Sequence, residues 1–253
     1  MTLLNKRIVV TRAKDQSASL IAKLREDRAL VLYLPLIDIV PSANGYCPER
    51  LTDYDWLVLT SVNAVRHFGA CLNAAEKSYA DLRQCRVAAI GEATARALRN
   101  AGVEVHVVPE THVSGPLIEA LLNSEPRPEG KRVLLPQGNL SKSDIADALE
   151  AKGMSVTPVV CYETVLRQPE PLELQEFLDF APDGITFFSP SAVHSFTRAG
   201  LPEKLAAKGK HPVYASIGSL TTRALQNGAL SRFVEARQQS EEGIIDAMKT
   251  YFG

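Results

Sequence analysis

Strand-like and helix-like patterns alternate along almost the whole chain, and this alternation limits the fold more than any other feature of the sequence. Short β-branched runs are each followed by a corner and then by a helical pattern. The pairs are "RIVVT" with "QSASLIAKLRE", "WLVLTS" with "NAVRHFGACLNAA", "VAAIG" with "EATARALRNAG", "RVLLP" with "SKSDIADALEAKG", "ITFFSP" with "SAVHSFTRAG", and "VYASIG" with "SLTTRALQNG". This order favours parallel strands joined by covering helices. The sequence therefore predicts the α/β class.

The alternation also repeats at long range. "WLVLTSVNAVRHF" at 56–68 is similar to "GITFFSPSAVHSF" at 184–196, so that Ser61 and Ser189 stand 128 positions apart. Gly91 and Gly218 stand 127 positions apart, and "RIVVTR" precedes "RVLLPQ" by 125. We interpret this as two related α/β halves that arose by duplication.

The composition excludes several classes of protein. The chain has 253 residues, of which 45% are hydrophobic and 23% charged, enough for two modest domains. A net charge of −1 provides no global reason to bind nucleic acid or a membrane, so any anion site must be local. The start, "MTLLNKRIVVTRAKD", lacks the features of a signal peptide, and we expect a cytoplasmic protein.

Each predicted strand ends at a corner, and these corners are the candidate functional positions. In an open parallel sheet the carboxyl ends of all strands lie along one edge, and the following helices direct free N–H groups and positive dipole ends towards that edge. Such an edge favours anions. The alternative is structural, because serine and glycine are also common at helix starts and tight turns. The corners begin at Thr11, Ser61, Gly91, Pro136, Ser189 and Gly218.

The signatures of familiar anion-binding enzymes are absent from the sequence. It contains no G-x-G-x-x-G, no G-x-x-x-x-G-K-[ST] and no G-x-S-x-G, so dinucleotide, nucleoside triphosphate and α/β-hydrolase functions are not indicated. The cysteines and histidines are not spaced as metal ligands. We expect a site built from hydroxyls and backbone amides, without a metal or an organic cofactor.

Several phrases together carry a family resemblance. "VVTRAKDQSASLIAKL", "LPLIDIVP", "WLVLTSVNAVRHF", "AAIGEATARALRNAG", "VLLPQGNLSKSDIADAL", "CYET", "FFSPSAVHSF" and "SIGSLTTRALQNG" occur in this order and span nearly the whole chain. Each phrase alone is weak, but their joint order and spacing resemble uroporphyrinogen-III synthase.

The resemblance implies a chain that begins in one domain, crosses to the second and returns. Carried over to this sequence, 1–36 and 168–253 would form the first α/β domain, and 41–162 the second. The segments 37–40 and 163–167, which overlap "LIDIV" and "CYETVL", would be a connecting β ladder that acts as a hinge.

The resemblance also implies the activity of a cyclising hydro-lyase in haem biosynthesis. Such an enzyme closes the linear tetrapyrrole hydroxymethylbilane to uroporphyrinogen III, with loss of water and inversion of ring D. The substrate carries eight carboxylates, and positioning is the main task of the protein. The implied partners are this small molecule and, transiently, the preceding pathway enzyme, with no nucleic acid and no membrane. We expect a monomer.

The implied substrate-binding residues all belong to the corners. Arg12 could instead be a solvated loop charge, since exposed charge contacts are usually weak. At the fourth corner Gln137 stands where the family commonly has arginine, which puts a charge contact there in doubt. The candidates are Thr11, Arg12, Ser61, Asn63, Gly91, Thr94, Ser189, Ser191, Gly218, Thr221 and Thr222.

Tyr162 is the candidate catalytic residue. The resemblance places the tyrosine of "CYET" facing the substrate, where a phenol could donate a proton to the departing hydroxyl. The alternative is an aromatic side chain packed on a connecting strand with its hydroxyl hydrogen-bonded.

A second hypothesis comes from another class of protein. Two α/β halves also suit a non-catalytic two-domain binder that closes on an anionic small molecule. The missing export signal counts against the usual location of such binders. An assay with hydroxymethylbilane separates the two hypotheses, because a binder would leave the isomer composition of the product unchanged.

Overall fold

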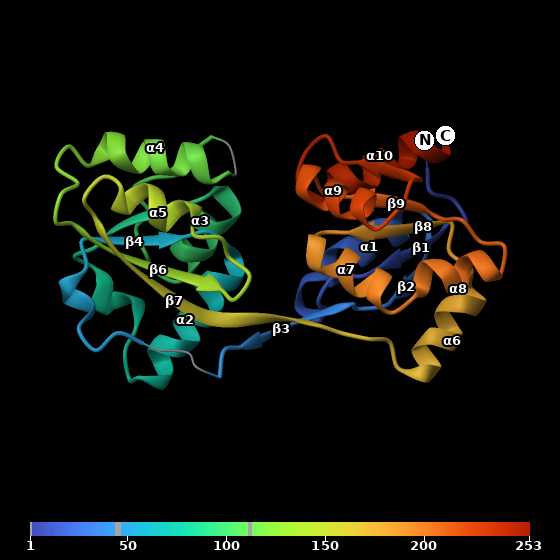
Figure 1. Ribbon diagram of the computed structural model, residues 1–253, viewed down its shortest axis with the longest axis horizontal. Helices are drawn as coiled ribbons and strands as arrows, with labels where there is room; N and C mark the ends of the chain where they lie inside the picture. Colours follow the sequence, from blue (N-terminus) through green and yellow to red (C-terminus); the bar gives the residue numbers. More distant parts are fainter. Residues whose placement is uncertain (1, 44–46, 111–112) are drawn as a thin grey trace. The chain divides into compact units, whose positions relative to one another are not determined.

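The structure, a computed structural model, describes residues 2–43, 47–110 and 113–253. The chain divides into two compact units, which are described separately (Figure 1). Unit 1 comprises 1–39 and 165–253, and unit 2 comprises 40–164. Strands β3 (Ile37–Pro41) and β7 (Ser155–Leu166) each cross a boundary between the units. They are neighbours in the sheet and run in opposite directions, because Ser42 N–H donates to the Cys161 carbonyl and Arg167 N–H to the Leu36 carbonyl.

The sheet of unit 1 is parallel, in the spatial order β10-β9-β8-β1-β2. Its central strands are buried along almost their whole length, as strands covered by helices on both sides must be. The strands are β1 (Arg7–Val10), β2 (Leu30–Tyr33), β8 (Gly184–Phe187), β9 (Val213–Ser216) and β10 (Phe233–Glu235).

Helices cover both faces of this sheet. Leu20 of α1 and Met248 of α10 pack on one face, whereas Phe196 of α7 and Leu225 of α9 pack on the other. The elements are the 3-10 helix η1 (Lys14–Gln16) and the helices α1 (Ala18–Glu26), α6 (Pro171–Phe180), α7 (Pro190–Arg198), α8 (Leu201–Ala207), α9 (Ser219–Asn227) and α10 (Glu241–Phe252).

The sheet of unit 2 has the spatial order β3-β7-β6-β4-β5. Strands β7, β6, β4 and β5 are parallel, and Val107 extends the sheet beyond β5 through a parallel bridge to Ala88. The remaining strands are β4 (Trp56–Leu59), β5 (Arg86–Ala89) and β6 (Arg132–Gly138). The α/β class with parallel-dominated sheets is thus confirmed.

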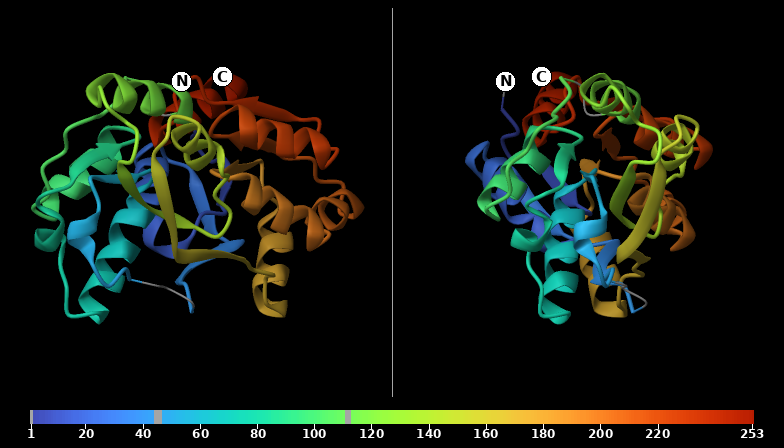
Figure 2. Two further views of the ribbon diagram at one scale, coloured as in Figure 1. Left: turned by 60° about the vertical axis from the view of Figure 1, so that its left-hand side comes forward. Right: turned by 90° about the vertical axis from the view of Figure 1, so that its left-hand side faces the viewer.

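Unit 2 is layered like unit 1. Phe68 of α2 and Leu98 of α3 pack on one face of the sheet, and Leu121 of α4 and Leu149 of α5 pack on the other; Figures 1 and 2 show α2 and α4 on opposite sides. Within the described residues, no helix is long and apolar enough to cross a membrane. The elements are η2 (Leu51–Asp53), η3 (Tyr79–Leu82), α2 (Val62–Ala74), α3 (Glu92–Asn100), α4 (Ser114–Ser124) and α5 (Asp144–Glu150).

The two units share one strand order, which explains the sequence repeat. The repeated phrases pair β8 with β4, β9 with β5, and β1 with β6, and in each unit these paired strands occupy the same places in the sheet. The chain leaves β1 and β8 in opposite directions across the sheet, and it does the same at β6 and β4. Each unit therefore has one topological switch point, between β1 and β8 in unit 1 and between β6 and β4 in unit 2.

An aspartate clamps the start of the central strands in each unit. In unit 1, Asp183 accepts from the backbone N–H of Arg7 at 2.8 Å and from its guanidinium at 3.1 Å. In unit 2, Asp55 accepts from the backbone N–H of Arg132 at 2.8 Å and from Lys131 Nζ at 2.8 Å. Burial by itself would raise the pKa of each carboxyl, but these bonds outweigh it and lower the pKa below the ordinary value.

We expect Asp183→Asn to lower the free energy of unfolding of unit 1 by about 1–2 kcal/mol at neutral pH, a value reduced for partial exposure of the pair. The pKa of Asp183 is lower in the folded protein than in the unfolded chain, where it is about 4. The contribution of Asp183 to the free energy of unfolding is therefore fully present above the unfolded pKa, and it is lost as the pH falls through the lower folded pKa. The difference between wild type and variant should therefore shrink at acid pH.

The single tryptophan, Trp56, lies in β4, so its fluorescence follows unit 2 during urea unfolding while far-ultraviolet circular dichroism follows both units. Asp55→Asn is the matched control, because it should shift the fluorescence transition instead. Equal shifts of the Trp56 transition by both variants would contradict the assignment of each clamp to one unit.

Candidate active site

The predicted corners lie at the carboxyl edges of two sheets, and they form two rims. Rim 1, in unit 1, contains Arg12 after β1 and Ser189 after β8. Rim 2, in unit 2, contains Ser61 after β4 and Gly138 at the end of β6. These positions flank the two switch points, where ligands of doubly wound sheets bind. As candidate ligand-binding positions, the topology therefore favours four corners over those at Gly91 and Gly218. The favoured corners begin at Thr11, Ser61, Pro136 and Ser189.

Ser61 and Ser189 start their helices in the same way. Ser61 has φ −160° and ψ 156°, and its Oγ accepts from Ala64 N–H at 3.0 Å. Ser189 has φ −157° and ψ 153°, and its Oγ accepts from Ala192 N–H at 3.3 Å. Both serines are half-buried N-caps, so part of the structural interpretation holds at each.

The structure brings Tyr162 to the second corner. Its hydroxyl lies 3.3 Å from Ser61 Oγ, although the two residues are 101 positions apart. Its ring lies against the buried His67, with centroids 5.4 Å apart and planes tilted by 32°. Burial raises the pKa of the phenol, an effect partly offset by the bond to Ser61, so Tyr162 holds its proton at neutral pH.

A register shift in the sheet aims Tyr162 at this corner. Gln137 pairs with Val160, whereas the next residue, Gly138, pairs with Tyr162, so that Cys161 is passed over. A Cβ atom on Gly138 would lie 2.6 Å from the Tyr162 ring. Only glycine leaves room for the phenol in this position. The carbonyl of Gln137 accepts from Cys161 Sγ at 3.5 Å. The side chain of Gln137 is uncharged, so it adds no charge to rim 2.

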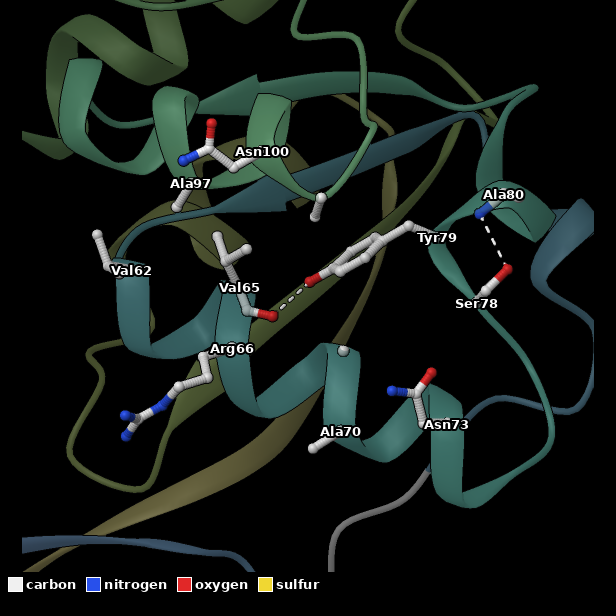
Figure 3. A pocket seen from close by; sticks show the side chains of 12 residues that line it. Val62, Val65, Arg66, Ala70, Asn73, Ser78, Tyr79, Ala80, Ala97 and Asn100 are labelled. Carbon is white, nitrogen blue, oxygen red and sulfur yellow. Dashed lines mark hydrogen bonds between the residues drawn. The ribbon is translucent and has the colours of Figure 1, made fainter. Parts of the chain in front are cut away.

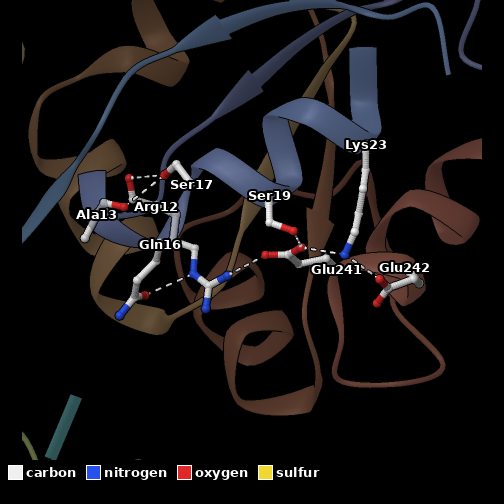
Figure 4. A network of polar contacts seen from close by, with 8 residues as sticks. All are labelled: Arg12, Ala13, Gln16, Ser17, Ser19, Lys23, Glu241 and Glu242. Atoms are coloured by element: carbon white, nitrogen blue, oxygen red, sulfur yellow. Dashed lines mark hydrogen bonds and ion pairs between the residues drawn. The ribbon is translucent and has the colours of Figure 1, made fainter. Parts of the chain in front are cut away.

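Arg12 is fixed in place at rim 1 (Figure 4). Its Nε donates to Gln16 Oε1 at 3.0 Å and its Nη1 to Glu241 Oε1 at 3.2 Å. The guanidinium lies over the Phe188 ring, 4.5 Å from the centroid. Burial lowers the pKa of Arg12, opposed by the charge of Glu241, yet an arginine remains protonated at any physiological pH. These contacts count against the interpretation of Arg12 as a solvated loop charge.

Four of the predicted hydroxyls turn inward instead of towards a ligand. Thr11 is fully buried, and its Oγ1 donates to the Thr186 carbonyl at 2.7 Å, which ties β1 to β8. Thr222 is buried beside Ser216 and also donates to Glu235, which joins α9 to β9 and β10. Thr94 and Thr221 are buried in the same way at the third positions of their helices. Their burial supports a structural role for these four hydroxyls, and their contact with substrate stays a prediction.

The remaining predicted residues lie at or near the helix starts. Gly91 and Gly218 are N-caps in extended conformation, with φ 179° and 167°, and they offer no side chain to a ligand. Asn63 and Ser191 are half-buried in the first turns of α2 and α7.

A cavity of about 730 Å³ lies in unit 2 between α2, α3 and η3 (Figure 3). Tyr79 crosses it and donates to the Val65 carbonyl at 2.6 Å. Among the described residues that line it, none is a predicted binding or catalytic residue. The cavity is therefore a feature of helix packing beside the rim and is not the predicted site.

Sequence reasoning missed Gly138, Phe188 and Glu241. Gly138 stands in the quoted phrase "PQG", and Phe188 directly precedes the serine of the fifth corner, so both carried a local signal. Glu241 carried no local signal for a role at this rim, because it is 229 positions from Arg12 in the sequence.

Comparison with known proteins identifies the family and the fold. The family described as "Uroporphyrinogen-III synthase HemD" matches residues 6–246. The uroporphyrinogen-III synthase of Synechococcus elongatus is 29% identical over 259 residues, covering 98% of this chain and 96% of its own length. That of Chlorobaculum parvum is 27% identical over 226 residues, covering 87% and 89%.

Two solved structures share the fold. Uroporphyrinogen-III synthetase from Helicobacter pylori has a TM-score of 0.67 at 20% identity, covering 97% of this chain and 99% of its own. A mutant uroporphyrinogen III synthase from Thermus thermophilus has a TM-score of 0.62 at 18% identity, covering 98% of both chains. At these identities the likeness concerns the fold alone.

Proposed function

Because the chain belongs to the uroporphyrinogen-III synthase family, we propose that rim 1 and rim 2 bind carboxylates of hydroxymethylbilane and that Tyr162 assists the loss of water. The protein is a cyclising lyase of tetrapyrrole biosynthesis, and its product is uroporphyrinogen III. The contact between Tyr162 and Ser61 at a switch point is the observation that supports this site most strongly.

The reaction needs a leaving group and a fixed geometry. The nitrogen of ring A, the terminal pyrrole that carries the hydroxymethyl group, pushes electrons towards the hydroxymethyl carbon, the C–O bond breaks, and the hydroxide takes a proton to leave as water. The substituted α-carbon of ring D attacks the azafulvene that remains and forms a spiro intermediate. The bond from this carbon to the methylene bridge of ring C then breaks, and the methylene carbon bonds to the other α-carbon of ring D, which loses its proton, so that ring D is inverted. Unaided closure gives the uninverted type I isomer, so the protein must favour one attack geometry over another.

Proton donation is assigned to Tyr162. A phenol has one proton, so if Tyr162 donates it to the departing oxygen, Ser61 must be the donor in the contact between Ser61 and Tyr162. Ser61 Oγ already accepts from Ala64 N–H, which leaves the serine proton free to point at Tyr162. The pair would then form a chain in which Ser61 donates to Tyr162 and Tyr162 donates to substrate.

Carboxylate binding is assigned to the helix starts and to Arg12. The starts of α2 and α7 direct the positive ends of their helix dipoles at the rims. Arg12 adds a guanidinium group at rim 1. Its charge-assisted hydrogen bonds to a carboxylate are stronger than hydrogen bonds between neutral groups. Contacts of this kind need little net charge, which agrees with the overall charge of −1.

The purified protein with freshly prepared hydroxymethylbilane tests the function. We expect the product to be predominantly the type III isomer, whereas the same substrate without protein gives type I. A protein that only binds the tetrapyrrole would slow or sequester the reaction without changing the isomer, and that result would overturn the proposal.

The two capping serines provide a matched pair for the site. Ser61→Ala and Ser189→Ala should each destabilise their helix start by about 1 kcal/mol. Ser61→Ala also removes the partner of Tyr162, so its kcat should fall about 5-fold, whereas Ser189→Ala should raise KM with little change in kcat. Steady-state kinetics and thermal unfolding of both variants check this. Complete inactivation of a folded Ser61→Ala protein would identify a direct chemical role for the serine instead.

We further propose that the protein works as a cytoplasmic monomer and receives its substrate during a transient contact with the preceding enzyme. Hydroxymethylbilane closes by itself to the wrong isomer, so a short transfer time favours the correct product. Light scattering of the protein alone should give a mass near 27.6 kDa. A stable dimer under these conditions would contradict the monomer.

A further inference from the structure

Glu241 joins three groups at rim 1 (Figure 4). Its Oε1 accepts from Arg12 Nη1 at 3.2 Å, and its Oε2 accepts from Ser19 Oγ at 2.8 Å and from Lys23 Nζ at 2.8 Å. The carboxylate is 17% exposed, and it is thus the central acceptor of the network. Its neighbour Glu242 is 61% exposed and contacts Lys23 but has no contact with Arg12.

The backbone that carries Glu241 is itself held firmly. Ser240 caps α10, with its Oγ accepting from Gly243 N–H at 3.0 Å. A Cβ atom on Gly243 would lie 2.1 Å from the Gln238 carbonyl oxygen, so the loop and the helix start are in close contact. Glu241 is the first residue of α10, where the helix dipole stabilises a carboxylate.

Arg12 is held on three sides and left open on one. Gln16 fixes Nε, Glu241 fixes Nη1, and the Phe188 ring supports one face of the guanidinium. In the part of the chain that the structure describes, Nη2 has no hydrogen-bond partner. Lys23 shares the charge of Glu241, so Arg12 is oriented by this carboxylate without being fully neutralised by it.

We propose that Glu241 is a positioning residue, which holds the guanidinium of Arg12 against Phe188 so that its open edge binds a carboxylate of the tetrapyrrole. An unrestrained arginine loses considerable rotamer freedom when it forms a bidentate contact, and one that is already oriented loses less. Glu241 touches no substrate in this scheme. The inference rests on the proposed function, because it assigns Arg12 to the same substrate.

The experiment compares Glu241→Gln with Glu242→Gln. Both variants remove one charge from adjacent positions of α10 and weaken a contact with Lys23, but only the first changes the partner of Arg12. We expect Glu241→Gln to raise KM about 5- to 30-fold with kcat within about 2-fold of wild type. Glu242→Gln should leave both constants near wild type.

The same substitution in an Arg12→Gln background separates positioning from general stabilisation. If Glu241 acts through Arg12, Glu241→Gln should cause no further rise of KM once Arg12 is absent. A full additional effect in that background would overturn the inference, since it would reveal a merely structural role. A fall of KM in Glu241→Gln would overturn it as well, because Glu241 would then be a competitor of the substrate carboxylate.

A nuclear magnetic resonance signal makes the result independent of activity. The side-chain Nη–H resonances of Arg12, assigned by their loss in Arg12→Gln, should exchange slowly with solvent in wild type and Glu242→Gln, and rapidly in Glu241→Gln, because Glu241 accepts from Nη1. An unchanged signal in Glu241→Gln overturns the positioning role whether or not the protein is active. Formation of only the type I isomer by wild type, with the expected change of the signal, would refute the proposed function while supporting the positioning of Arg12.

Discussion

Replacing Tyr162 by phenylalanine is expected to lower the single-turnover rate about 10- to 100-fold while type III remains the enzymatic product. The phenol assists the departure of water, whereas the shape and the amide groups of the site decide which carbon attacks. The two tasks should therefore separate in this variant.

The expected size of this effect follows from the state of the phenol. General acid assistance is typically worth about 10²–10⁴-fold, but it is smaller when the pKa of the acid lies far above the working pH. Burial raises the pKa of Tyr162 above its ordinary value near ~10, and the substrate also ionises unaided. Because the proton is lost only above that value, the Tyr162-dependent part of the rate should be constant from neutral pH to about pH 9.

The measurement is the single-turnover rate and the ratio of type III to type I product, for wild type and Tyr162→Phe. Tyr79→Phe is a control, since that phenol donates to the Val65 carbonyl inside unit 2 and its removal should affect stability only. A wild-type rate in Tyr162→Phe would exclude proton donation. Rapid turnover to type I product would mean that Tyr162 shapes the substrate instead.

Gly138→Ala is expected to reduce turnover at least as much as Tyr162→Phe, although alanine carries no reactive group. Its Cβ would lie 2.6 Å from the Tyr162 ring, a distance that no packed structure tolerates. Since the contact is with side-chain atoms, the ring moves before the backbone does. The phenol should leave Ser61, and the unit should also lose about 1–3 kcal/mol of stability through overpacking.

A double variant tests whether the two residues act as one. If Gly138→Ala works by displacing the phenol, the combination of Gly138→Ala and Tyr162→Phe should be no slower than the slower single variant. Gly115→Ala is the control, because a Cβ atom at that position of α4 would meet nothing within 4 Å. Multiplied losses in the double variant would show that Gly138 affects the reaction by another route.

Local patterns predicted the framework of these sites. The alternation of strand and helix gave the class, and the repeat from Ser61 to Ser189 anticipated two helix starts whose backbone angles agree within a few degrees. Both successes concern interactions between residues close in the chain. Caps and strand-helix corners form between neighbours, so the chain itself carries their signal.

The sequence by itself therefore determined the elements, their corners and the residue types at each rim, whereas the tertiary structure decided which of the hydroxyls are buried and bonded within the protein. Thr11 and Thr222 look like rim residues in the sequence, but their hydroxyls satisfy carbonyl and carboxylate groups of neighbouring strands. Glu241 looks like an ordinary helix start, but it holds Arg12 from 229 positions away. A buried polar group must find its partner in space, and no local pattern encodes where that partner stands.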